Sequence, residues 1–117
     1  MTVFVAESSE SVLSGLSKIK TAMIEDYNSM SYNDEMKANF ADGISIEYGS
    51  KYIKVFKTLG SQKCIWGFIV GVDTDKKFKK GDILKPAGYA APARNAARGN
   101  IIDGGYTINW TGPLYLK

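Results

Sequence analysis

Residues 44–70, ISIEYGSKYIKVFKTLGSQKCIWGFIV, decide the fold, because they contain three strand-like runs separated by two glycine–serine turns. In the first run apolar and polar residues alternate, which is typical of a strand with one buried face. The turns are Gly49-Ser50 and Gly60-Ser61, and such pairs favour hairpins. The last run, 64–70, is continuously apolar, as in a central strand that is covered on both faces. We expect these strands to form an antiparallel meander.

A long amphipathic helix is expected before this meander, over residues 9–29. Ser8 or Ser9 can cap it, and Glu10 would then lie in its first turn. Its apolar residues recur with the helical period, which predicts a buried face that packs on the sheet. These residues are Val12, Leu16, Ile19, Met23 and Tyr27, with Leu13 and Ile24 at the sides of the stripe.

A short second helix is predicted over residues 34–41. Asn33 is a good N-cap residue, and Met36 and Phe40 are four residues apart, so they lie on one helix face. Gly43 can end the helix in the left-handed conformation.

The chain after the meander predicts further short strands. Strands are expected at 83–84 and 106–110, with a break at Gly112-Pro113. Residues 85–99 are rich in Ala, Gly and Pro, and allow one turn of helix at 93–97. Residues 1–117 are therefore expected to form a single α+β domain, with both helices packed on an antiparallel sheet of about five to seven strands.

The composition argues against several functional classes. The chain has no histidine and one cysteine, Cys64, which leaves no disulfide framework, no Cys-rich zinc site and no histidine-dependent triad. No apolar run approaches the roughly 18 residues of a membrane span, and the first residues lack the features of a secretory signal. We expect no enzymatic activity, no cofactor and no membrane partner.

The acidic residues and the cysteine are interpreted as structural. Glu25-Asp26 and Asp34-Glu35 are adjacent pairs, so their carboxylates diverge on a helix. Asp73 and Asp75 could touch a divalent ion, but the rest of a calcium loop is missing, and a turn role is favoured. Cys64 lies in the most apolar run, where a thiol is normally buried and inert.

The charge is divided between the two parts of the chain. Residues 1–50 carry three lysines and eight acidic residues, whereas residues 51–117 carry twelve basic and four acidic residues, which together give the net charge of +3. This predicts a bipolar surface if the two parts occupy different faces. The alternative is that the parts fold together and neutralise each other.

Basic and aromatic residues alternate in a pattern that favours nucleic-acid binding. Lysines and arginines follow phosphates, and aromatic rings stack on exposed bases. Tyr52, Lys54 and Phe56 would share one face of a strand, and Arg94 and Arg98 would share a face if their segment is helical. The expected phosphate ligands are Lys51, Lys54, Lys57, Lys77, Lys79, Arg94 and Arg98, and the expected stacking residues are Tyr52, Phe56 or Tyr89.

A structural interpretation of the same residues stays open. Aromatic residues of an antiparallel sheet usually belong to the core, and lysines on strand edges prevent aggregation. The net charge of +3 is modest for a dedicated nucleic-acid-binding domain.

The last third of the chain resembles short uncharacterised proteins of tailed bacteriophages. The similarity rests on GDIL-K-A within Lys80–Ala87, AP-A-N-ARGN within Ala91–Asn100, and WTGPLYL at Trp110–Leu116. The resemblance implies a phage gene product that works in the bacterial cytoplasm or in the virion, and it carries no site residue over.

Two functions follow from these observations as hypotheses. The first is a non-enzymatic phage-type accessory protein that binds nucleic acid through a basic, aromatic-lined face. The second is a self-associating structural or assembly protein, a homo-oligomer in which the acidic part of one copy meets the basic part of the next. Trp110, Leu114 and Tyr115 would anchor that contact. Inhibition of a host enzyme is a third possibility that the sequence does not separate from these two.

Overall fold

The computed structural model describes residues 3–88 and 91–113. It confirms a single α+β domain with both helices packed on antiparallel strands. These strands divide between two sheets instead of forming one. The elements are β1 (Val3–Val5), α1 (Val12–Asn28), α2 (Asp34–Asp42), β2 (Ser45–Tyr48), β3 (Tyr52–Leu59), β4 (Gln62–Val70), β5 (Ile83–Leu84), β6 (Tyr106–Asn109) and β7 (Gly112–Pro113).

The larger sheet has the strand order β2-β3-β4-β5 and is antiparallel throughout. Its first three strands are the predicted meander of residues 44–70. Gly60 closes the turn between β3 and β4 with a φ of +62°, which glycine adopts without strain. Residues Trp66–Val70 of β4 are buried, as predicted for a central strand.

A bulge in β4 changes which side chains face which side of the sheet. Val55 pairs with Gly67 and the next residue, Phe56, pairs with Ile65, so Trp66 is the extra residue. Trp66 is completely buried, and its Nε1 donates a hydrogen bond of 2.9 Å to the carbonyl oxygen of Asn109 in β6. The bulge thus turns one indole ring toward the second sheet.

The smaller sheet has the order β1-β6-β7. Strand β1 was not predicted, because three residues are too few to show an alternating pattern. It pairs antiparallel with β6, with Phe4 opposite Thr107. The expected break at Gly112-Pro113 is wrong: these residues form β7 and pair with the end of β6. Proline is compatible with this position because β7 is an edge strand.

Helix α1 begins three residues later than predicted. Its N-cap is Ser11, whose hydroxyl accepts a hydrogen bond of 3.2 Å from the backbone N–H of Ser14. The expectation of a cap at Ser8 or Ser9 is therefore wrong, and Glu10 precedes the helix.

The predicted apolar face of α1 is confirmed, with Leu13 as the exception. Leu13 is 69% exposed, because it lies beyond the margin of the buried stripe. Gly15 allows a close approach of the chain after β5, since a Cβ atom there would lie 2.8 Å from the carbonyl oxygen of Ile101. The buried residues of the stripe are Leu16, Ile19, Met23 and Tyr27.

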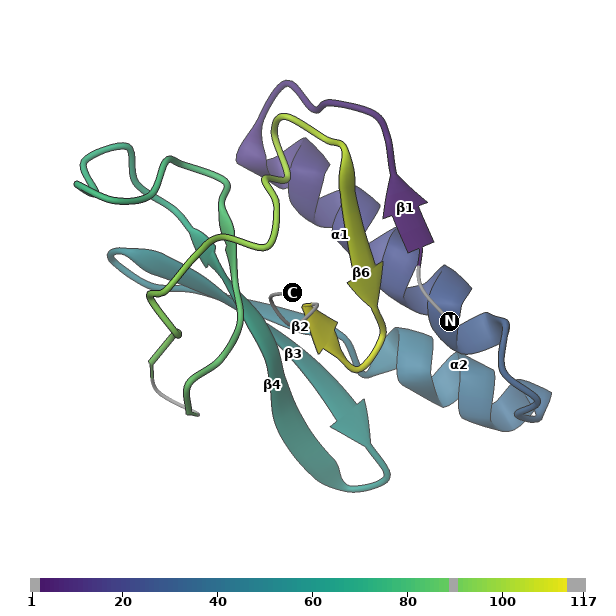
Figure 1. The fold of residues 1–117 in the computed structure, drawn as a ribbon. Coiled ribbons are helices and arrows are strands. Elements are labelled where there is room, and N and C mark those ends of the chain that lie inside the picture. Colours follow the sequence, from purple (N-terminus) through teal and green to yellow (C-terminus); the bar gives the residue numbers. More distant parts are fainter. Residues whose placement is uncertain (1–2, 89–90, 114–117) are drawn as a thin grey trace.

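Helix α2 has the predicted N-cap but a different C-terminal end. Asn33 Oδ1 accepts a hydrogen bond of 2.8 Å from Met36 N–H, whereas Gly43 is right-handed with a φ of −87°, so the left-handed ending is wrong. Phe40 is buried and stacks on Tyr27, with ring centroids 4.1 Å apart. In Figure 1 both helices lie on the same side of the molecule, and β6 and β1 pass in front of α1.

Residues 85–88 and 91–100 contain no helix or named strand and lie along β5, and the expected turn of helix at 93–97 is not formed. The N–H of Arg98 donates to the carbonyl of Ile83 at 2.8 Å, and the N–H of Ile83 donates to Gly99. Nearer the start of the segment, Ala93 N–H donates to the carbonyl of Lys85 at 2.7 Å. These backbone bonds fix the path of a segment whose apolar residues are mostly small.

Two apolar clusters form the core. The large one joins α1, α2, the inner face of β3 and β4, and β6. The small one contains Phe68, Val70, Phe78 and Leu84, with Tyr52 and Val72 packed against it. The small cluster supports the loop in which the basic turn lies.

Candidate nucleic-acid interface

The loop between β4 and β5, residues 71–82, holds the basic turn, and Asp75 shapes it. Asp75 Oδ1 accepts hydrogen bonds from the backbone N–H groups of Lys77, at 2.8 Å, and Phe78, at 3.0 Å. This local capping of two N–H groups is a common role for aspartate in turns. Phe78 is buried, while Lys76 and Lys77 are exposed. The predicted turn role of Asp75 is confirmed.

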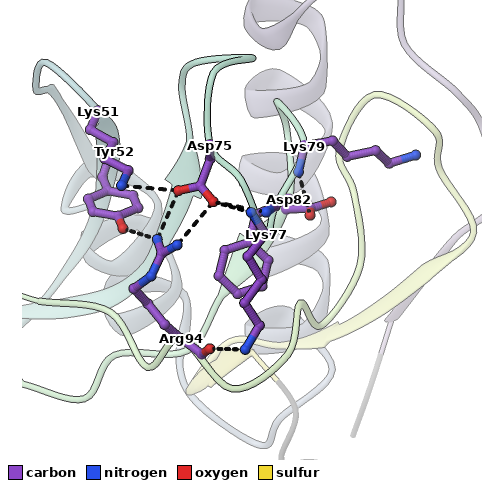
Figure 2. A network of polar contacts seen from close by, with 8 residues as sticks. Lys51, Tyr52, Asp75, Lys77, Lys79, Asp82 and Arg94 are labelled. Atoms are coloured by element: carbon purple, nitrogen blue, oxygen red, sulfur yellow. Dashed lines mark hydrogen bonds and ion pairs between the residues drawn. The ribbon is translucent and has the colours of Figure 1, made fainter.

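The carboxylate of Asp75 also binds two cations from distant parts of the chain (Figure 2). Arg94 donates to both of its oxygens at 3.0 Å, and Lys51 Nζ lies 3.1 Å from Oδ2. The Asp75 side chain is shielded from solvent. The Arg94 hydrogen bonds, followed by those from Phe78 and Lys77 N–H, hold the pKa of this carboxyl well below its usual range.

The guanidinium of Arg94 is held on several sides (Figure 2). Besides Asp75, it donates to the hydroxyl of Tyr52, and its Cζ lies 4.9 Å from the ring centroid of Phe78. The backbone carbonyl oxygen of Arg94 accepts a hydrogen bond of 2.5 Å from Lys77 Nζ. The Asp75 hydrogen bonds raise the pKa of Arg94 above its ordinary value.

An open groove of about 450 Å³ lies beside this network. Three cations and one acid line it, and Lys77 is joined to its wall through Arg94. Lys51, Lys76, Lys77 and Arg94 carry four positive charges and Asp75 carries one negative charge, which leaves a local excess of three. The excess is two if Asp73 in the same loop is included. The groove is lined by Ser50, Lys51, Val72, Thr74, Asp75, Lys76 and Arg94.

The structure brings together four of the residues that the sequence proposed for this interface. Lys51 directly precedes β3 and Tyr52 is the first residue of that strand, Lys77 comes from the loop after β4, and Arg94 comes from the segment beside β5. Asp75 binds the side chains of Lys51 and Arg94 and the backbone N–H of Lys77, and Tyr52 is connected to it through Arg94. The groove is therefore a convergence of three chain segments that are far apart in the sequence.

Two further predicted residues, Lys54 and Phe56, lie on the same face of β3 as Tyr52, but neither side chain is fully exposed. Tyr52, Lys54 and Phe56 alternate along the strand as expected. Phe56 is only 1% exposed, with Lys63 Nζ 4.2 Å from its ring centroid, so its ring has no open face for a base. Lys54 is half-buried.

Lys57 does not lie on this surface. It belongs to the opposite face of β3, is 8% exposed, and donates a hydrogen bond of 2.6 Å to the carbonyl oxygen of Thr111. Burial lowers its pKa. The expectation that Lys57 holds a phosphate is corrected for this reason: the ammonium group lies inside the protein, 5.2 Å from the ring centroid of Trp110.

The remaining predicted residues do not join the groove. Lys79 pairs with Asp103, which raises the pKa of the lysine. Arg98 donates to Asn95 Oδ1 at 3.1 Å and to the Ala96 carbonyl at 2.9 Å, and it shares no helix face with Arg94 because the segment is not helical. Tyr89 lies outside the described residues.

Sequence reasoning missed the ion pair that organises this site. Asp75 and Arg94 are 19 residues apart. The pattern Asp-Lys-Lys-Phe signals the turn, but the partner of Asp75 depends on the path of residues 91–100, which no local pattern reveals. Ser50 and Thr74, which line the groove, were also missed.

Two other features are absent from the described part of the chain. Within residues 3–88 and 91–113, no three His, Cys, Asp or Glu side chains are grouped so that they could hold a metal ion. No helix in those ranges is long and apolar enough to cross a membrane.

Comparison with known proteins places the chain in a family. No curated protein and no solved structure matches the sequence. The family of unknown function DUF7717 matches residues 3–116. Because the match spans almost the whole chain, the protein belongs to DUF7717.

Proposed function

We propose that this protein is a non-enzymatic accessory protein that binds nucleic acid through the groove beside Asp75. The observation that carries the proposal is the basic lining of this groove: Lys51, Lys76 and Arg94 line it, and Lys77 is joined to its wall through Arg94. The phage setting and the cytoplasmic or virion location implied by the sequence resemblance are part of this proposal.

The chemistry of the groove suits phosphodiesters. Its excess of positive charge attracts a polyanion, and the lysine ammonium groups neutralise phosphates and release counterions. The hydroxyl groups of Ser50 and Thr74 can donate hydrogen bonds to phosphate oxygens. Phosphate contacts carry no sequence information, so we expect little sequence preference.

The aromatic part of the original hypothesis changes. Phe56 and Phe78 are buried and Tyr52 is half-buried, with its hydroxyl bonded to Arg94. These rings support the sheet and the loop. The phosphate contacts therefore carry the proposed affinity, with Lys51, Lys76 and Lys77 as ligands.

A salt titration tests the proposal. We expect a fluorescently labelled single-stranded oligonucleotide of mixed sequence to bind at about 50 mM salt. Three phosphate contacts predict a slope of about −2 in a plot of log K against log salt concentration. Lys51→Gln and Lys76→Gln should each weaken binding and reduce the magnitude of the slope by about 0.7.

Lys20→Gln is the matched control. Lys20 is an exposed lysine of α1 that does not line the groove, so the same loss of charge there should leave the slope unchanged. Absence of binding at low salt, or equal effects of the Lys20 and Lys51 substitutions, would contradict the proposed interface.

A further inference from the structure

The hydrogen-bonding edge of Arg94 is already occupied. Nη1 donates to Asp75 Oδ2 and to the Tyr52 hydroxyl, and Nη2 donates to Asp75 Oδ1. An arginine that grips a phosphate normally presents this same edge as a two-pronged donor. A phosphate would have to displace a carboxylate that is shielded from solvent. Arg94 is thus poorly placed to be the phosphate ligand that its charge suggests.

The flat faces of the guanidinium are in a different situation. The guanidinium carbon, Cζ, lies 4.9 Å from the ring centroid of Phe78, which is itself packed in the small core. The side chain is nevertheless 38% exposed and lines the groove. With Asp75 at one edge and Phe78 on one side, a further planar group has to approach the guanidinium from the side away from Phe78.

The guanidinium is also held firmly in place. The bidentate bond to Asp75 fixes its plane, and the bond to the Tyr52 hydroxyl fixes it from a second side (Figure 2). The neighbouring backbone is fixed by the bonds from Lys77 Nζ and Ala93 N–H. A planar group that is already ordered loses little entropy when a second planar group stacks on it.

We propose that Arg94 is a stacking platform for one unpaired nucleobase, which lies on the guanidinium face opposite Phe78. This inference rests on the proposed function and makes it more specific, because a base is accessible only in a single strand. Guanidinium planes stack on bases in the same way as aromatic rings. Lys51 and Lys76, on the same groove, would hold the flanking phosphates.

The experiment compares a single-stranded oligonucleotide with an abasic strand of the same length, which carries the phosphates and sugars without bases. We expect the protein to bind the intact strand at least about fivefold more tightly. Arg94→Lys, which keeps the charge, should bring this ratio close to one and leave the salt slope unchanged. Lys51→Gln should do the reverse, with a smaller slope and an unchanged ratio.

Tyr52→Phe is the control for the stacking role of Arg94, because it removes the hydrogen bond to the Tyr52 hydroxyl and keeps both hydrogen bonds to Asp75. This variant should keep most of the preference for the intact strand over the abasic strand. The intact and abasic oligonucleotides are compared with the unsubstituted protein, so this comparison does not depend on whether any variant folds. Equal binding of the intact and abasic strands would overturn the stacking inference alone. Failure to bind either strand at low salt would overturn the proposed function and the inference with it.

Discussion

At the scale of single residues, Asp75 makes the site possible. A carboxylate without solvent around it is costly unless hydrogen bonds and cations replace the water. Asp75 has both: two backbone N–H donors from its own turn and the side chains of Arg94 and Lys51. It fixes the local conformation of the turn and also collects cations from elsewhere in the chain.

Asp75→Asn tests this double role, because asparagine can keep the turn while losing the charge. The folded-state pKa of Asp75 lies below its unfolded value. Its contribution is therefore fully present above the unfolded pKa, about 3.9, and is lost as the pH falls below that value. We expect the unsubstituted protein to be more stable than the variant near neutral pH, with a difference that shrinks below about pH 4.

The measurement is urea unfolding of both proteins between about pH 7 and about pH 3. Other acidic groups titrate in both proteins, so the difference between the two isolates Asp75. A difference that stays constant through this range would mean that the carboxylate charge does not stabilise the fold.

Residue roles were predictable from the sequence only where they are local. The cap at Asn33 and the turn role of Asp75 both depend on neighbours within three residues, and both are confirmed. Lys57 was wrongly predicted to lie on the binding surface. An alternating strand pattern shows which residues share a face of the strand, but it does not show which face is covered. The second sheet covers the Lys57 face, and its existence depends on β1 and β7, which were not predicted.

At the scale of secondary-structure elements, the bulge in β4 joins the two sheets. A regular strand would direct Trp66 and Phe68 to the same side. With Trp66 as the extra residue, its indole belongs to the large core and Phe68 to the small one. The same strand thus supports both the contact between the sheets and the base of the loop that carries the candidate site.

Trp66→Phe should reduce the free energy of unfolding by about 1–3 kcal/mol, because the Asn109 carbonyl loses its donor within a packed region. Urea unfolding followed by far-UV circular dichroism measures the loss. Trp110→Phe is the matched control, since the same substitution there leaves the bond between the sheets in place. Equal losses in both variants would contradict a specific role for this hydrogen bond.

Elements with a strong periodic pattern were predicted, whereas two of the short strands, β1 and β7, were not, although the short strands β5 and β6 were. The meander and both helices have patterns that extend over eight or more residues, so local side-chain order determines them. Strands β1 and β7 contain three and two residues and exist because β6 offers them hydrogen-bonding partners. Such strands depend on tertiary structure, which a pattern in one segment cannot express.

At the scale of the whole molecule, the two sheets form a single unit. The large apolar cluster includes residues of both helices and of both sheets, and the bond from Trp66 crosses between the sheets. We expect one cooperative unfolding transition, with a free energy of about 5–15 kcal/mol. Tryptophan fluorescence and far-UV circular dichroism should give coincident urea curves, and separate midpoints would show that the sheets unfold independently.

The division of charge along the chain also has a counterpart in the fold. The acidic first fifty residues form β1, both helices and β2, whereas the basic groove is built from the start of β3, the loop after β4 and the segment beside β5. This arrangement is compatible with the competing hypothesis of head-to-tail self-association, which stays a prediction. Of its proposed anchors, Trp110 packs against Tyr27 and Phe40, and Leu114 and Tyr115 lie outside the described residues.

The pairing of β1 with β6 has a consequence for biosynthesis. Val3–Val5 emerge from the ribosome before their partners at 106–108, which follow about a hundred residues later. At roughly 5–20 residues per second, the nascent β1 waits on the order of 5–20 seconds before it can pair. The meander can form during this interval, whereas the smaller sheet must form after translation has reached β6.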